Sequence, residues 1–249
     1  MVTKLSHEQL SALRRIDSPT ISNAIETFKV RPRIAGYVGY DIRCIFPELP
    51  PTVGYAVTCT VDSTTEGRQG IGFQRLYELL ANAPKPAIVV MQDVGTDRLH
   101  SCHAGEVMST RMKRLGAIGI LTDGGLCDVR EVRTLGGFQY FCAGLVVSHG
   151  NPVCVDVGGE VTISGSASVR VTCCTETPMV SCISPMSVRT RSLRPLTASG
   201  LRRGKPCAES RVLNSPPSPA QRLNIEREFV EMTLAVSLET ETNHARAHY

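Results

Sequence analysis

Two continuous apolar runs separated by one helical segment constrain the fold more than any other feature of this sequence. The run Pro86–Met91 is followed by Asp93, and the run Ala117–Thr122 is followed by Asp123. Between the runs, residues 105–115 have the pattern of a helix. Strands that are apolar throughout are typical of parallel sheets, in which helices form the connections between strands. The sequence therefore predicts an α/β fold around a parallel sheet.

The other predicted elements extend this alternation of strands and helices. We expect further helices at 6–15, 20–28, 70–80 and 128–135, and further strands at 55–61 and 140–148. Ser18 and Pro19 suit the N-cap and the first position of the second helix. Residues 153–164 alternate around Gly158-Gly159, which predicts a hairpin.

Size and composition are those of a globular protein without a membrane span. The chain has 249 residues, of which 42% are hydrophobic and 20% charged. No apolar run approaches the ~20 residues that a transmembrane helix requires, and the first residues lack the apolar core of a secretory signal. The ten cysteines include no Cys-x-x-Cys pair, so we expect reduced thiols and a cytoplasmic location.

The net charge of +4 comes from one segment. Seven basic and two acidic residues lie between Ser166 and Glu209, so the rest of the chain is slightly acidic. Because the positive charge is confined to an irregular stretch and not spread over a folded face, we expect no nucleic-acid partner.

The segment 166–210 differs from the α/β domain predicted for residues 1–165. It lacks strand or helix periodicity and is rich in Ser, Thr, Pro, Arg and Cys. Disorder is one interpretation. The other is a frame-shifted read, because back-translation with common codons, read two nucleotides out of phase, can give Pro-Gly-Asp-Leu-Leu-His-Gly-Asp, a turn followed by an apolar strand. The frame would be restored near Arg211, before a C-terminal helix within 211–233 and a polar tail at 234–249; sequencing the gene for compensating insertions and deletions tests this.

The start of the helix at Gly105 is a candidate anion site. The first backbone N–H groups of a helix have no partners within the helix, and the helix dipole adds partial positive charge. Residues Gly105, Glu106, Val107 and Met108 supply those N–H groups. A substrate carboxylate or phosphate suits such a position.

Asp128 and Glu131 follow the Ala117–Thr122 strand, at the sheet edge where α/β proteins bind ligands. One interpretation is a Mg²⁺ site, in which Asp128 is the single protein ligand and Glu131 holds a metal-bound water. The other is a helix cap, in which Asp128 caps the following helix and Glu131 completes a capping box. Spacing alone leaves both open.

Together these motifs resemble the RraA-like family. The resemblance rests on Gly105-Glu106, Asp123-Gly124-Gly125 and Asp128-x-x-Glu131, with the segment Asp17–Ile25 similar to the family's N-terminal helix. It covers about residues 8–165. The family includes class II 4-hydroxy-4-methyl-2-oxoglutarate aldolases and regulators of ribonuclease E activity.

The resemblance implies a swivelling β/β/α sandwich that assembles as a homotrimer or hexamer, with active sites between subunits. It also implies a lyase that cleaves 4-hydroxy-4-methyl-2-oxoglutarate or decarboxylates oxaloacetate, both short 2-keto acids, to give pyruvate. Asp128 is then the Mg²⁺ ligand, Glu131 supports a bound water, and the backbone of residues 105–108 holds the substrate carboxylate. The metal stabilises the enolate that forms when the carbon–carbon bond breaks. The alternative function is a noncatalytic regulator that binds a ribonuclease or another protein.

Cys127 departs from the family pattern, which has arginine before the metal-binding aspartate. A thiol does not replace a bidentate cation, and the loss is expected to cost about 3 kcal/mol or more of transition-state binding. Four interpretations stay open: a weak aldolase that uses Arg111, Arg130 or another subunit's arginine; a noncatalytic binder; a different substrate; or a sequence lesion. A nucleophilic Cys127, with His103 near it in space, is disfavoured, as is a zinc site of His100, Cys102 and His103.

Overall fold

The structure is a computed structural model that describes residues 5–27, 37–164, 169–171 and 179–182. All described residues belong to one compact unit of the chain, residues 1–185. The predicted C-terminal helix at 211–233, the polar tail at 234–249 and most of the segment 166–210 lie outside the described residues. None of the described helices is both long enough and apolar enough to cross a bilayer.

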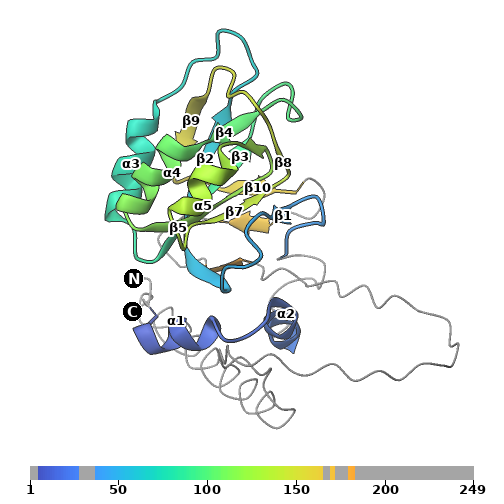
Figure 1. The fold of residues 1–249 in the computed structure, drawn as a ribbon, viewed down its shortest axis with the longest axis vertical. Coiled ribbons are helices and arrows are strands. Elements are labelled where there is room, and N and C mark those ends of the chain that lie inside the picture. The colour runs from blue at the N-terminus through green and yellow to red at the C-terminus, as the bar shows by residue number, and fades with distance from the viewer. Residues whose placement is uncertain (1–4, 28–36, 165–168, 172–178, 183–249) are drawn as a thin grey trace, which may run out of the picture. The chain divides into compact units, whose positions relative to one another are not determined.

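A seven-stranded sheet forms the centre of the fold (Figure 1). Its parallel part has the order β7-β5-β3-β2, with strands β2 (Thr52–Asp62), β3 (Ala87–Asp93), β5 (Ala117–Thr122) and β7 (Gln139–Cys142). The strands that pair antiparallel with its edges are β1 (Arg43–Cys44) on β7, and β9 (Val153–Val157) and β12 (Met179–Cys182) on β2. The two apolar runs are thus neighbouring parallel strands, as predicted.

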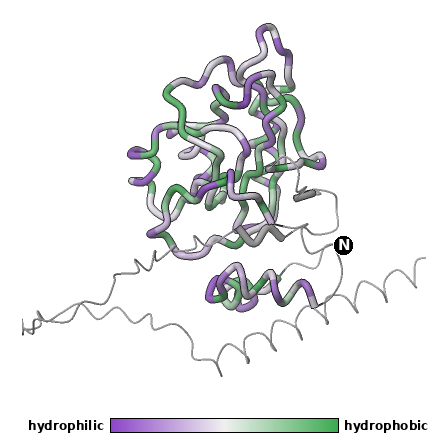
Figure 2. Tube along the Cα trace, turned by 90° about the vertical axis from the view of Figure 1, so that its right-hand side faces the viewer, coloured by the Kyte–Doolittle hydropathy of each residue, from purple (hydrophilic) through white to green (hydrophobic). Residues whose placement is uncertain are grey.

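The two faces of the sheet bury different layers. Helices α3 (Phe73–Asn82), α4 (Glu106–Arg114) and α5 (Val129–Thr134) cover one face, where Leu76, Met112 and Val132 join the larger core. Strand β10 (Val161–Ile163), paired with β11 (Val169–Val171), contributes to a smaller core on the other face. Figure 2 shows hydrophobic stretches running through the body of the fold and hydrophilic ones at its outer loops.

A second, smaller parallel sheet positions the candidate site. Strands β4 (Cys102–Ala104), β6 (Gly125–Leu126) and β8 (Gly144–Leu145) follow β3, β5 and β7 in the chain and lie in the same order, β4-β6-β8. Helix α4 begins directly after β4, and the loop to α5 begins directly after β6. Because β4 and β6 are hydrogen-bonded neighbours, the start of α4 and residues 127–128 are adjacent in space.

Two helices precede the sheet, α1 (His7–Leu13) and α2 (Ser18–Thr27). Ser6 caps α1 in a capping box with Gln9. The cap of α2 was predicted at Ser18 but the side chain of Asp17 fills that role, because its Oδ1 accepts from the Thr20 N–H at 2.8 Å. Asp17 is the better acceptor because it carries a full negative charge at the positive end of the helix.

Several predicted elements differ from those in the structure. The prediction of a hairpin at 153–164 is wrong, because β9 pairs with β2 and β10 pairs with β11. The strand predicted at 140–148 is divided between β7 and β8, which belong to different sheets. Strands β11 and β12 lie within the segment 166–210 that was predicted to be irregular. In each case the strand forms because it pairs with a segment distant in the sequence, and local periodicity does not predict such pairing.

Candidate functional site

The candidate site is built where the start of α4 meets the loop that contains Asp128. The Glu106 backbone N–H donates to Asp128 Oδ2 at 2.9 Å. Gly105, the N-cap residue of α4, packs so closely here that a Cβ atom on it would lie 2.2 Å from Asp128 Oδ2 and 2.7 Å from Cys127 Sγ. Both distances are shorter than any real contact, so this approach requires glycine. Gly105, Glu106, Cys127 and Asp128 are therefore adjacent in space.

Asp128 does not cap its own helix. Its backbone is left-handed, with φ of 54°, and its side chain makes no capping hydrogen bond to α5. The capping-box interpretation of Asp128 and Glu131 is thus wrong, because the left-handed backbone turns the carboxylate toward α4. There it occupies the helix start that was predicted to hold a substrate anion. A carboxylate has about four acceptor positions, so the exposed Asp128 can accept a further ligand.

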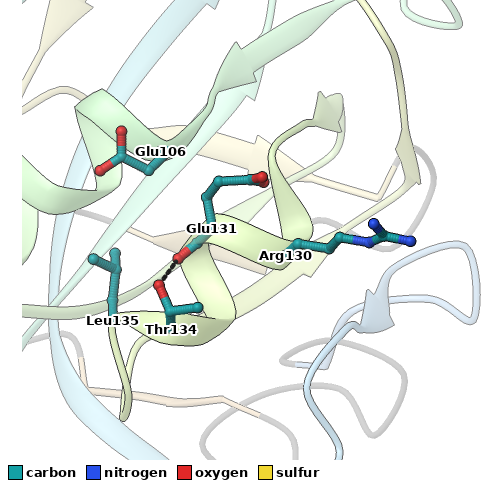
Figure 3. Close-up of a pocket in the computed structure, with 5 residues that line it drawn as sticks. All are labelled: Glu106, Arg130, Glu131, Thr134 and Leu135. Atoms are coloured by element: carbon teal, nitrogen blue, oxygen red, sulfur yellow. Dashed lines mark hydrogen bonds between the residues drawn. The ribbon is translucent and has the colours of Figure 1, made fainter.

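A hollow of about 350 Å³ opens beside this contact, lined by Glu106, Arg130, Glu131, Thr134 and Leu135 (Figure 3). Glu106 Oε1 accepts from the Thr110 hydroxyl at 2.6 Å. In Figure 3 the Arg130 guanidinium extends away from Glu106 and Leu135. The hollow therefore presents two carboxylates, Glu106 and Glu131, beside that of Asp128, an arrangement that favours cations over anions.

The other two predicted residues of the helix start, Val107 and Met108, differ in their surroundings. Val107 is exposed, and the Met108 side chain packs against the larger core. Neither side chain has a polar group to offer a ligand, so only their backbone N–H groups suit the predicted role.

Cys127 is a protonated thiol held inside the loop. Its Sγ donates to the Ala104 carbonyl oxygen at 3.7 Å. Burial, the neighbouring Cys102 thiol and the Asp128 carboxylate all raise the pKa of Cys127 far above its ordinary value. A nucleophilic cysteine requires the opposite shift, toward the thiolate. Cys127 is thus neither the cation of the family pattern nor an activated nucleophile.

Arg111 does not replace the missing cation within this subunit. Its guanidinium lies 4.1 Å from the centre of the Tyr77 ring and donates to Gln74 Oε1 at 3.1 Å. Both partners belong to α3, so Arg111 serves the packing of α4 on α3.

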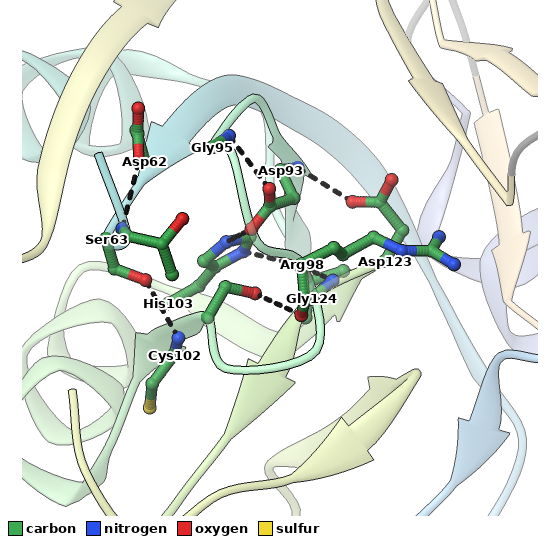
Figure 4. A network of polar contacts seen from close by, with 12 residues as sticks. Asp62, Ser63, Asp93, Gly95, Arg98, Cys102, His103, Asp123 and Gly124 are labelled. Atoms are coloured by element: carbon green, nitrogen blue, oxygen red, sulfur yellow. Dashed lines mark hydrogen bonds and ion pairs between the residues drawn. The ribbon is translucent and has the colours of Figure 1, made fainter. Parts of the chain in front are cut away.

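A buried polar network behind the site was not predicted from the sequence (Figure 4). The His103 ring is fully buried, with Nε2 at 2.7 Å from Asp93 Oδ2 and Nδ1 at 2.7 Å from Thr122 Oγ1. Burial alone raises the pKa of Asp93, but hydrogen bonds from His103, Ser101 and the Gly95 N–H hold it below its ordinary value. Asp93 is thus ionised.

Asp123 extends this network, because its Oδ1 accepts from the Asp93 N–H at 2.7 Å. Burial raises the pKa of Asp123. The zinc interpretation fails here: His100 is exposed and bonded to Asp97, while His103 is enclosed. No group of three or more His, Cys, Asp or Glu side chains suited to a metal occurs in the described part of the chain.

A hard cation with few protein ligands fits the residues that are present. Mg²⁺ keeps several waters and takes one or two carboxylates, so it does not require a cluster of three side chains. Asp128, fixed by the Glu106 N–H, supplies one carboxylate, and Glu131 in the adjoining hollow suits a metal-bound water.

A family model described as RraA-like (Aldolase/RraA) matches residues 18–174, well over half of the chain. The chain belongs to the RraA-like family. The match includes both loops of the site and the buried network behind them. No curated protein matches the sequence.

Solved structures agree on the RraA-like fold. RraAS2 of Streptomyces coelicolor, described as an unusual member of the RNase ES inhibitor RraA family, is 19% identical, with a TM-score of 0.51 over 68% of this chain and 80% of its own. A structure described as novel cellulases from gut-associated microbes is 15% identical, with a TM-score of 0.54 over 68% and 74%. An uncharacterized protein of Pseudomonas syringae pv. tomato is 17% identical, with a TM-score of 0.50 over 66% and 70%. At these identities the likeness concerns the fold alone.

Proposed function

We propose that this protein is a divalent-metal-dependent lyase of the RraA-like family that acts on a short 2-keto acid and whose turnover is limited by Cys127. The observation that carries the proposal is the hydrogen bond from the Glu106 N–H to Asp128. It fixes one carboxylate beside a hollow that contains Glu106 and Glu131. Such an arrangement suits a hydrated Mg²⁺ ion.

Each residue of the candidate site has a separate role in the proposed reaction. Asp128 would hold the metal, and Glu131 would orient a water on it. Within the 105–108 helix start, the Glu106 N–H is taken by Asp128, so the Val107 and Met108 N–H groups would receive the substrate carboxylate. When bound, Mg²⁺ supplies a Lewis acid that draws electron density from the 2-keto group as the carbon–carbon bond breaks. The candidate substrates are 4-hydroxy-4-methyl-2-oxoglutarate and oxaloacetate, and pyruvate is the common product.

Cys127 sets the expected rate. A neutral thiol bonded to the Ala104 carbonyl offers no charge to the substrate carboxylate or to the developing negative charge on the keto oxygen. The loss of one such contact lowers the rate by about a hundredfold to a thousandfold. Without the positive charge of an arginine at position 127, the carboxylates of Glu106 and Glu131 also repel an anionic substrate.

The test is pyruvate release from both substrates, with and without Mg²⁺, by the wild type and three variants. We expect weak metal-dependent release by the wild type and at least tenfold faster release by Cys127→Arg. Cys127→Ala is the matched control, since it removes the thiol without adding a cation, and it should stay at the wild-type rate. Asp128→Ala should abolish release. If neither the wild type nor Cys127→Arg releases pyruvate in the presence of Mg²⁺, the proposed lyase activity is refuted.

A noncatalytic regulator is the second candidate. The inward-turned thiol of Cys127 favours it, because a binding protein does not require the arginine. A pull-down against a ribonuclease, followed by a cleavage assay with that ribonuclease, tests it. Inhibition that is unchanged in Asp128→Ala, together with silent lyase assays, would establish this function. The homotrimer or hexamer expected for either function is measured by light scattering.

A further inference from the structure

The fully buried His103 connects three segments of the chain that lie behind the candidate site. Its ring lies between the ends of two parallel strands, with Asp93 at the end of β3 and Thr122 at the end of β5. Neither His103 nor Thr122 has any exposed surface. The two hydrogen bonds, both 2.7 Å long, therefore act without competition from water.

These hydrogen bonds link Gly124 to Asp93. Asp93 is ionised and only accepts, so His103 Nε2 carries the proton that is donated to it. His103 Nδ1 forms the second hydrogen bond with the Thr122 hydroxyl, and Thr122 Oγ1 accepts from the Gly124 N–H at 3.1 Å. The chain of hydrogen bonds thus runs from Gly124 through Thr122 and His103 to Asp93 and fixes the ring orientation.

The ring also packs closely against the loop that leads to Asp128. A Cβ atom on Gly124 would lie 2.6 Å from His103 Cε1 and 2.8 Å from Nε2. Only glycine permits this approach. His103 therefore restrains Gly124 twice, once through Thr122 and once by direct contact.

His103 also stands two residues before Gly105, the N-cap of α4. The same side chain thus holds both segments that the Glu106–Asp128 hydrogen bond joins: the start of α4 through the backbone, and the Asp128 loop through Thr122 and Gly124. We propose that His103 is a positioning residue that sets the spacing between the start of α4 and the Asp128 carboxylate, and with it the geometry of the cation site. Only the part of this inference that concerns the bound cation rests on the proposed function.

The Asp93–His103–Thr122 chain has the order of a nucleophilic triad but not its access. A nucleophile must reach a substrate, whereas Thr122 has no exposed surface. The three residues also belong to strands β3, β4 and β5, whereas the hollow is lined mainly by residues of helices α4 and α5. Positioning, and not covalent catalysis, is the role that this geometry supports.

The test uses the full-length protein and two perturbations of the network. Thr122→Val removes the hydroxyl at nearly constant volume, whereas Thr122→Ser retains it. His103→Gln keeps a donor for Asp93 but has no imidazole to contact Gly124. Gln139→Leu is the matched control, because Gln139 is also buried and its side-chain hydrogen bonds go to the Phe46 and Tyr140 backbone, outside both site loops.

The first readout needs no metal. In ¹H–¹⁵N spectra, the Glu106 amide proton is hydrogen-bonded to a carboxylate, so loss of that bond shifts it upfield. We expect the shift in His103→Gln and Thr122→Val, and not in Thr122→Ser or Gln139→Leu. An unmoved Glu106 resonance in both folded network variants overturns the positioning role. So does an equal shift in Gln139→Leu, since it would reflect general loosening.

The second readout is Mn²⁺ affinity, measured by electron paramagnetic resonance. We expect a loss of roughly tenfold to a hundredfold in His103→Gln and Thr122→Val, as for other residues that orient a metal ligand, with Thr122→Ser near the wild type. Unchanged affinity in both variants contradicts the inference. If the wild type binds no Mn²⁺, the cation site of the proposed function fails, and the Glu106 resonance still decides on His103.

Discussion

The contact between Gly105 and Asp128 makes a quantitative prediction about Gly105→Ala. The added methyl group requires Asp128 Oδ2 and Cys127 Sγ to move, because it would lie 2.2 Å and 2.7 Å from them. Both atoms end short side chains near the surface, so they move without disturbing the core. The hydrogen bond from the Glu106 N–H to the carboxylate is the interaction that is lost.

The magnitude follows from two opposing effects. A hydrogen bond to a charged group contributes about 1.5–3 kcal/mol, and less where the carboxylate is exposed, as Asp128 is. Replacing glycine by alanine stabilises by about 0.4–1 kcal/mol through the unfolded chain. We expect a net loss of about 1 kcal/mol in the free energy of unfolding. With an m-value near ~2 kcal/mol per molar, the urea midpoint falls by roughly 0.5 M.

The assay is urea unfolding followed by circular dichroism, together with Mn²⁺ binding. Gly144→Ala is the control: a Cβ atom there meets nothing within 4 Å, so only the unfolded-chain effect acts and its midpoint should rise by roughly 0.2–0.5 M, while its Mn²⁺ affinity should match the wild type. Gly105→Ala should lose at least tenfold in Mn²⁺ affinity. A Gly105→Ala protein with the wild-type midpoint and wild-type affinity would refute the assigned position of Asp128.

Two further predictions concern titration. Because the pKa of Cys127 is raised, a maleimide should label it far more slowly than free cysteine at neutral pH and faster as the pH rises; peptide mapping measures this, and rapid neutral labelling contradicts it. The lowered pKa of Asp93 means that its ionised form stabilises the fold above the ordinary value of 3.8, and that this contribution is lost as the pH falls through the lower folded value. Unfolding from about pH 7 to pH 3 should therefore show a shallower acid loss in Asp93→Asn than in the wild type, and equal slopes would count against an ionised Asp93.

The central sheet was predictable because the amino-acid pattern of its strands is visible in the sequence itself. Apolar residues along β3 and β5 are buried on both faces, so the runs are continuous in the sequence. The strands of the small sheet β4-β6-β8 have only two or three residues, too few to show a period. Their existence depends on the larger sheet, which aligns them in the order of β3, β5 and β7.

The role of Asp128 illustrates what spacing does not determine. An aspartate three residues before a glutamate suits a capping box and a metal ligand equally well. The left-handed backbone at Asp128 prevents its side chain from capping α5. The backbone conformation of a single residue cannot be predicted from the spacing of residues in the sequence. The function of His103 was inaccessible for a different reason. Its partners Asp93 and Thr122 lie 10 and 19 residues away on separate strands.

The structure also explains how Cys127 is tolerated. Asp128 is held by the Glu106 N–H, by the left-handed turn and by the approach of Gly105, and the first two do not depend on the Cys127 side chain. The Cys127 thiol meanwhile bonds to the Ala104 carbonyl. Replacing arginine by cysteine therefore removes a positive charge without dismantling the support of the carboxylate. The proposed function therefore predicts that metal binding and substrate turnover are separable: the wild type should bind Mn²⁺ as tightly as Cys127→Arg or more tightly, because the added cation repels the metal, while turnover should follow the opposite order.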